Sequence, residues 1–140
     1  MEYTIKQTKP GEDMTEVIKA RQMVASSWTG HDTKGFAEAE DDLDEMAINI
    51  ILEKDGEPVG CGRLLLDMES DRIIIEQIGV IKQEQGSGAA IAVADALMNI
   101  AKETETETIW AKPHGNPAAI SLLEKKGFEQ LNPYWMTYEI

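Results

Sequence analysis

The stretch from residue 71 to residue 103 constrains the fold more than any other, because a strand, a tight turn and a helix follow one another there. The run IIIEQIGVI is apolar on both faces, which is typical of a strand in the middle of a sheet. Gly86-Ser87-Gly88 then precede a helix built largely of alanine. Bare backbone at a helix N-terminus favours an anionic group nearby. The stretch therefore predicts a central strand followed by an anion-binding turn.

Hydrophobic periodicity in the rest of the chain predicts an α/β fold with a mixed, mostly antiparallel sheet flanked by helices. Asp55-Gly56 joins two apolar runs and indicates a hairpin, after which a β-α-β crossover follows. We expect a single domain over residues 1–140, with about six or seven strands and three or four helices. The expected strands are 2–7, 46–54, 59–67, 71–81, 104–113 and 134–140, and the helices start at Asp13, within 37–45, near Gly88 and at Asn116.

The charge balance narrows the classes of partner. The formal net charge is −13, from 26 acidic and 13 basic residues. Such a field repels phosphate backbones and anionic membrane surfaces, and it favours an amine as substrate, so we expect neither nucleic acid nor membrane as a partner. No run approaches the roughly 18 apolar residues of a membrane span, and the N-terminus lacks the pattern of a signal peptide. With Cys61 as the one cysteine, these features favour a cytoplasmic protein.

The glycine-containing turn matches neither of the common nucleotide motifs. A P-loop requires Gly-Lys-Ser/Thr, but Ala89 and Ala90 follow Gly88 here. The dinucleotide fingerprint needs a third glycine at the position of Ile91. What remains is a group of backbone N–H donors at a helix N-terminus, which suits a pyrophosphate. A nucleotide-binding domain is therefore disfavoured.

At this turn the sequence resembles the GCN5-related N-acetyltransferase superfamily, whose signature is Gln/Arg-x-x-Gly-x-Gly/Ala. Two registers fit, Gln83 to Gly88 and Gln85 to Ala90, and we prefer the second because it keeps the usual spacing from Val80. The stretch NPAAISLLEKKGF is similar to the late helix of the family and its following Gly-Phe. The order of elements agrees as well. GCGRLL, with Arg63, is similar to a Gly-x-x-Arg-Leu pattern found in a small subgroup.

The resemblance implies an enzyme that transfers an acyl group, most simply acetyl, from acetyl-CoA to a small-molecule or lysine-like amine. The transfer is direct, in a ternary complex. The resemblance also implies that backbone groups of the central strand bind the pantetheine arm like an added strand, and that the amide of Val80 polarises the thioester carbonyl. The implied cofactor-binding residues are Ile78, Gly79 and Val80 for pantetheine, Gln85, Gly86, Ser87, Gly88, Ala89 and Ala90 for pyrophosphate, and Asn116, which also caps a helix.

Glu76 is the candidate catalytic residue. It interrupts an otherwise apolar strand, and a lone carboxylate there is costly unless it is paired or functional. We interpret it as the base that takes a proton from the ammonium group of the acceptor. Strand alternation would place it on the same face as Ile78 and Val80. The alternative is a purely structural salt bridge to Arg63 or Arg72.

The general acid is the point where the sequence departs from the family. A tyrosine is common seven residues after the asparagine, and Leu123 stands there instead. Tyr134 or Tyr138 could substitute, and neither is assigned. This departure keeps open a non-catalytic coenzyme A-binding or regulatory module of the same fold.

Other candidates carry weaker signals. His114 could be a second base or a substrate contact, and Trp135 could line the acceptor pocket. No metal is expected, since two distant histidines and one cysteine do not make a ligand set. The sequence leaves the acceptor, the acyl-chain length and the oligomeric state open, a homodimer included.

Overall fold

The chain forms one mixed sheet with helices on both sides. The computed structural model describes residues 3–28, 36 and 41–140. The strands are β1 (Thr4–Thr8), β2 (Ala47–Lys54), β3 (Glu57–Asp67), β4 (Arg72–Val80), β5 (Thr108–Ala111), β6 (Glu129–Gln130) and β7 (Met136–Glu139). The helices are α1 (Thr15–Ser27), α2 (Ala89–Lys102) and α3 (Pro117–Lys125), with short 3₁₀ turns η1 (Asp42–Met46) and η2 (Lys82–Glu84).

The sheet has the predicted mixed, mostly antiparallel character. Its strands lie in the order β1-β2-β3-β4-β5-β7-β6, and only the β4–β5 pair is parallel. β4 lies between β3 and β5, so the prediction of a central strand is confirmed. The hairpin between β2 and β3 turns at Asp55 (φ 53°) and Gly56 (φ 79°), as a two-residue turn with two left-handed positions requires.

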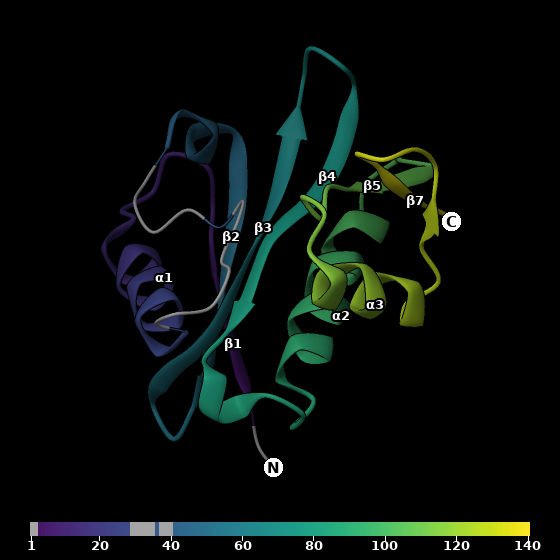
Figure 1. Cartoon of the computed structure of the whole chain (residues 1–140). Helices are drawn as coiled ribbons and strands as arrows, with labels where there is room; N and C mark the ends of the chain where they lie inside the picture. Colours follow the sequence, from purple (N-terminus) through teal and green to yellow (C-terminus); the bar gives the residue numbers. More distant parts are fainter. Residues whose placement is uncertain (1–2, 29–35, 37–40) are drawn as a thin grey trace.

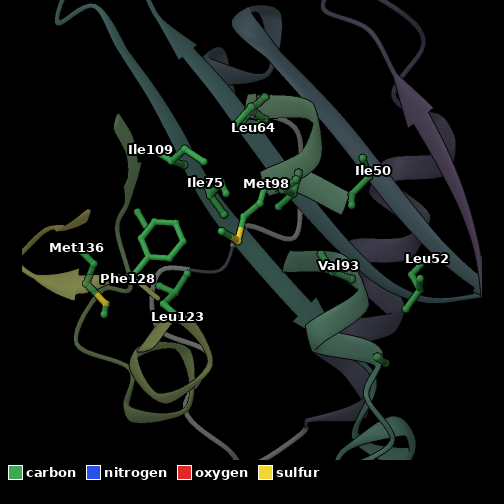
Figure 2. Close-up of a cluster of buried hydrophobic side chains, with 14 of the residues drawn as sticks. Ile50, Leu52, Leu64, Ile75, Val93, Met98, Ile109, Leu123, Phe128 and Met136 are labelled. Carbon is green, nitrogen blue, oxygen red and sulfur yellow. The ribbon is translucent and has the colours of Figure 1, made fainter. Parts of the chain in front are cut away.

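The helices divide between the two faces of the sheet. In Figure 1, α1 lies on one side of β2 and β3, and α2 and α3 lie on the other side. The larger core lies beneath α2 and α3. Figure 2 shows Ile50, Leu64 and Ile75 of the sheet meeting Val93 and Met98 of α2. A smaller apolar cluster lies under α1.

The termini of α3 confirm two predictions from the sequence. Asn116 Oδ1 accepts hydrogen bonds from the N–H groups of Ala118 at 2.9 Å and Ala119 at 3.4 Å, which caps the helix. Pro117 occupies the first helical position, where its missing N–H costs nothing. Gly127, at φ 96°, follows the helix in the left-handed conformation that ends many helices.

Several expected elements differ from the structure. Asp42–Met46 of the acidic stretch forms a 3₁₀ turn rather than an α-helix, and 37–40 lie outside the described residues. The two-residue strand β6 was not expected, because so short a polar segment has no periodicity. β5 begins only at Thr108, so the alternating Thr and Glu residues before it precede the strand. α1 begins after Asp13, whose carboxylate accepts from the N–H of Thr15.

A register shift in β4 changes which side chains share a face. Arg63 lies opposite Glu76, but Cys61 lies opposite Gly79, so β4 carries one extra residue between the two pairs. Gln77 has a φ of 56° at this bulge. Glu76 and Gly79 therefore lie on the α1 face, whereas Ile78 packs against the core under α2. Val80 packs against that core as well, so the expectation that Glu76 shares a face with Ile78 and Val80 was wrong, because strict alternation fails at a bulge.

Candidate active site

The two central strands separate before β4 ends. Pairing between β4 and β5 covers only Ile73–Ile75 and Ile109–Ala111, after which β5 stops and β4 continues. The N–H of Ile81 bonds to the carbonyl of Val59 at 2.8 Å, on the β3 side. Because peptide groups alternate in direction along a strand, those of Val80 face the open edge. The indole Nε1 of Trp28 donates to the Val80 carbonyl at 2.6 Å, so the N–H of Val80 is the group left at this edge.

By the same alternation, Ile78 presents its peptide groups at the open edge and Gly79 faces β3. Gly79 has a different structural role. A Cβ atom at this position would lie 2.8 Å from both Val24 and the ring of Phe36. The absence of a side chain therefore lets α1 and Phe36 approach the end of β4 closely.

A cleft of about 370 Å³ opens beside this edge. It brings together predicted site residues that are distant in sequence, together with the loop after β5 and the inner face of α3. Seven predicted residues line it: Glu76, Ile78, Gly79, Val80, Gln85, Ala90 and Asn116. Lys112, His114, Leu122 and Leu123 line it as well. Gly86, Ser87, Gly88 and Ala89 lie next to it, in the turn and first residue of α2.

The turn before α2 leaves room and hydrogen-bond donors for an anion. Gly86 (φ 79°) and Gly88 (φ 92°) are both left-handed, and a Cβ atom on either would meet nothing within 4 Å. The N–H groups of Gln85 and Ser87 are used inside the turn, by Lys82 and Glu84. In the described part of the chain, the N–H groups of Gly86, Gly88, Ala89 and Ala90 have no backbone acceptor. These four donors, at the positive end of α2, fit a pyrophosphate.

The turn is held by a polar cluster of Tyr3, Lys54, Glu84 and Ser87, which the sequence did not predict. The hydroxyl of Tyr3 donates to Glu84 Oε1 at 2.7 Å and lies 2.8 Å from Ser87 Oγ. Lys54 Nζ lies 3.1 Å from Glu84 Oε2. The hydrogen bonds from Tyr3 and Lys54 lower the pKa of Glu84. Lys54 thus balances a carboxylate that would otherwise repel an anion at the turn.

Glu76 is ion-paired. Arg63 donates to its Oε1 through Nη2 at 2.7 Å and through Nε at 3.2 Å. Its Oε2 accepts no hydrogen bond from any described residue, and its side chain, 6% exposed, borders the cleft. The salt bridge that the sequence offered as an alternative is therefore present. The role of Glu76 as a base remains a prediction, and the pairing leaves one carboxylate oxygen for it.

The ion pair belongs to a larger buried cluster under α1. Arg21 makes two bonds to Asp44, at 3.0 and 2.8 Å, and a third to Asn49 Oδ1 at 2.9 Å. All three side chains are buried. Arg63 Nη1 lies 3.2 Å from Asp44 Oδ1 and links this group to Glu76. Burial alone would raise the pKa of Asp44, but hydrogen bonds from Arg21 and the Asp41 backbone hold that pKa well below its usual range.

The candidates for a general acid do not gather in the cleft. Tyr134 is exposed, and Tyr138 packs against Phe128 with ring centroids 5.6 Å apart; neither lines the cleft. Leu123 is buried at the base of α3, where the family pattern would place a tyrosine (Figure 2). His114 does line the cleft, in a left-handed backbone conformation. Burial raises the pKa of the Cys61 thiol to about 12, which makes it a poor nucleophile.

Residues 17–128 match the model of the acetyltransferase (GNAT) family. The chain belongs to this family. Membership supports N-acetyltransferase activity in general, with acetyl-CoA as co-substrate, and confirms the resemblance drawn from the turn and the late helix. No curated protein matches the sequence significantly.

Solved structures of GNAT proteins share the fold. The ribosomal-protein-S18-alanine N-acetyltransferase of Escherichia coli superposes with a TM-score of 0.73 at 18% identity, covering 99% of this chain and 94% of that one. An N-acetyltransferase of Staphylococcus aureus Mu50 gives 0.71 at 16%, covering 99% of both chains. A GNAT family acetyltransferase of Elizabethkingia anophelis with acetyl-CoA bound gives 0.71 at 14%, covering 99% and 98%. At these identities the likeness concerns the fold.

The described residues also bear on membrane insertion and on metal binding. None of the helices in this part of the chain has the length and apolarity needed to cross a membrane. Histidine, cysteine and carboxylate side chains in the same residues form no group of three or more that would hold a metal ion.

Proposed function

We propose that this GNAT protein transfers an acetyl group from acetyl-CoA to a primary amine, directly and in a ternary complex. The observation that carries the proposal is the open edge of β4, where the N–H of Val80 and the carboxylate of Glu76 border one cleft. A polarising donor and a proton acceptor are the two groups that aminolysis of a thioester needs.

The donor substrate would bind along β4 and the turn before α2. The peptide groups of Ile78 and Val80 would take the pantetheine arm, and Gly79 would line its path. The side-chain N–H₂ of Asn116 would join them, because its Oδ1 already caps α3. The pyrophosphate would lie on the turn, against the N–H groups of Gly86, Gly88, Ala89 and Ala90. Gln85 and Ser87 would border it without donating, because their N–H groups are used inside the turn.

Glu76 would act through its Oε2, directly or through a water molecule. It would take the proton from the acceptor ammonium, and the freed amine would attack the thioester carbonyl carbon. Arg63 would hold the carboxylate in place by its other oxygen. Coenzyme A can leave as a thiolate, since a thiol of pKa about 8.5 is a good leaving group, so Leu123 does not block the reaction.

Binding is tested first by thermal denaturation. A ligand that binds only the folded state raises the melting temperature, so millimolar acetyl-CoA should stabilise the protein and ATP or NAD should not. Absence of a shift in a folded sample would contradict a coenzyme A site. Thiol release against a panel of amines then tests for turnover.

A non-catalytic coenzyme A-binding or regulatory module is the second candidate. Leu123 favours it, because neither Tyr134 nor Tyr138 reaches the cleft to replace the missing acid. It predicts stabilisation by acetyl-CoA without thiol release from any amine in the panel.

A further inference from the structure

Two cations and two indole rings form a cluster on the sheet face away from α2 and α3. Trp110 of β5 and Trp135, just before β7, meet edge to face with ring centroids 5.7 Å apart. The guanidinium carbon of Arg72 lies 3.9 Å above the Trp110 ring and 5.1 Å from that of Trp135. Lys112 Nζ lies 5.5 Å from the Trp135 ring. We call these four residues the cation–indole cluster.

The cation–indole cluster lies on the same sheet face as Glu76. Arg72, Ile74 and Glu76 alternate along β4 before the bulge, so their side chains leave the same side of the strand. Trp110 lies opposite Ile74. Arg72 and Glu76 are therefore about 13 Å apart along β4, with an indole between them on the next strand. Lys112 lines the same cleft as Glu76, which makes the cluster and the cleft continuous.

The positive charges of the cluster are not consumed by salt bridges. Neither Arg72 nor Lys112 forms one with a described carboxylate. Asp67 lies opposite Arg72 in register, and its oxygens bond to Ser70 and to the Glu69 N–H in the adjoining turn. The Ser70 hydrogen bond and, to a lesser degree, the charge of Arg72 lower the pKa of Asp67, so Asp67 offsets part of that charge without forming a salt bridge. An arginine stacked on an indole keeps the N–H groups of its edge for a ligand.

This arrangement is unusual for the chain as a whole. Acids outnumber bases 26 to 13, so two cations without a salt bridge beside one cleft form a local positive site on a negative protein. Both indole rings are half-buried and offer an apolar surface between the two cations. Arginine and lysine beside flat apolar rings suit a molecule with an apolar body and a carboxylate.

We propose that the cation–indole cluster binds the carboxylate and apolar body of an acceptor whose amine reaches Glu76. The acceptor class is then an amine that carries a carboxylate at the far end of an apolar spacer. The inference rests on the proposed acetyl transfer. One ammonium proton passes to Glu76, and the freed amine nitrogen forms a bond to the acyl carbon. The carbon–sulfur bond breaks with its electron pair on sulfur, and the second proton of the nitrogen passes to solvent water, which leaves the amide and the coenzyme A thiolate. The carboxylate is unchanged throughout.

Matched pairs of amines test the assignment by turnover. The pairs are para-(aminomethyl)benzoate with benzylamine, and ε-aminocaproate with pentylamine, each pair differing by one carboxylate. The ratio of kcat/KM for the carboxylated member over its partner should be at least about tenfold in the wild type, as expected for a charge-assisted hydrogen bond. In Arg72→Gln with Lys112→Gln the ratio should fall to near one. Lys102→Gln is the matched control, because Lys102 Nζ also lies over an aromatic ring, 5.2 Å from Tyr138.

A ratio near one in the wild type, or an unchanged ratio in the double variant, would overturn the proposal. Lys112 is exposed, so the single variant Lys112→Gln should fold. If the double variant is unstable, this single variant takes its place in the test, and it should lower the kcat/KM ratio.

A binding measurement separates this proposal from the proposed function. Calorimetry would titrate para-(aminomethyl)benzoate into protein saturated with coenzyme A, where we expect saturable binding that Lys112→Gln weakens. If no amine supports thiol release but this binding is seen, acetyl transfer fails and the carboxylate site stands. If no carboxylated amine binds or is preferred, the site is refuted whatever the activity with other amines.

Discussion

Arg63 and Glu76 are joined by two hydrogen bonds to one carboxylate oxygen, from Nη2 at 2.7 Å and Nε at 3.2 Å. The remaining nitrogen of the guanidinium, Nη1, bonds to Asp41 at 2.8 Å and Asp44 at 3.2 Å. A single buried arginine therefore connects the cleft to the charge cluster under α1. Substitutions in that cluster should therefore change the position of the Glu76 carboxylate, because Arg63 bonds to both.

Glu76→Gln should lower kcat by about 10²-fold or more, because the amide keeps the shape of the side chain but accepts no proton at neutral pH. The affinity for acetyl-CoA should barely change, because the proposed pantetheine contacts nearby are peptide groups of Ile78 and Val80, which this substitution leaves in place. Steady-state kinetics and calorimetry on one preparation would measure both quantities.

The ion pair with Arg63 makes some loss of stability expected in the same variant. Turnover is therefore expressed per folded molecule, from the folded fraction in a parallel denaturation curve. Full turnover per folded molecule would remove Glu76 from the mechanism and leave it the structural role alone.

Asp44→Asn should destabilise the fold by roughly 2–4 kcal/mol, because it leaves Arg21 and Arg63 buried with less negative charge. The folded-state pKa of Asp44 is lowered, so its contribution to stability is complete above the unfolded pKa of about 4 and is lost as the pH falls below it. Urea denaturation of the wild type should thus show a fall in unfolding free energy on acidification below about pH 4. In the variant that fall should be shallower. Parallel curves for the two proteins would contradict this assignment.

Gly88→Glu should abolish acetyl-CoA binding, since it adds bulk and a negative charge beside the free N–H groups of the turn. Gly88→Ala should also weaken binding, and its left-handed backbone should cost about 1 kcal/mol of stability. Gly11→Ala is the matched control: Gly11 has a φ of 82° and open space around it, but lies outside the cleft. It should lose similar stability and keep the wild-type Kd. Equal effects on Kd from both alanine variants would argue against the turn as the phosphate site.

Gln77→Val should destabilise the protein by about 1–2 kcal/mol, because a β-branched residue tolerates the left-handed φ of 56° poorly. Gln77→Asn should stay within about 0.5 kcal/mol of the wild type, since asparagine adopts that conformation more readily. Urea denaturation of the three proteins compares them directly. If valine were tolerated as well as asparagine, the bulge would not hold Gln77 in this conformation.

The sequence predicted the elements whose signals are local. Alternation located the hairpin strands, and Asn116-Pro117 located the start of α3, because capping and turn chemistry depend on neighbouring residues. It did not predict the bulge at Gln77, since nothing in IIIEQIGVI marks where the register slips. For that reason the prediction of the sheet face on which Glu76 lies was wrong.

The charge cluster had a partial signal in the sequence. Arg21 lies four residues after Val17 and three before Val24, which places it on the apolar face of α1. A charged residue there indicates a buried partner, although nothing in the sequence distinguishes Asp44 from the other acids among the 26. The contact between Tyr3 and the turn could not be predicted from the sequence either, because Tyr3 and Ser87 meet only through tertiary packing.

At the open edge of β4 the groups offered are peptide N–H and C=O, and the side chain of Ile78 points into the core instead. Among natural residues, only proline would delete the N–H of Val80. Descendants of this chain can therefore exchange the side chains around the cleft and still keep the backbone groups of this edge. Under the proposed function, side-chain substitutions around the cleft would alter the acceptor site, while the peptide groups that would hold the pantetheine arm persist with the backbone.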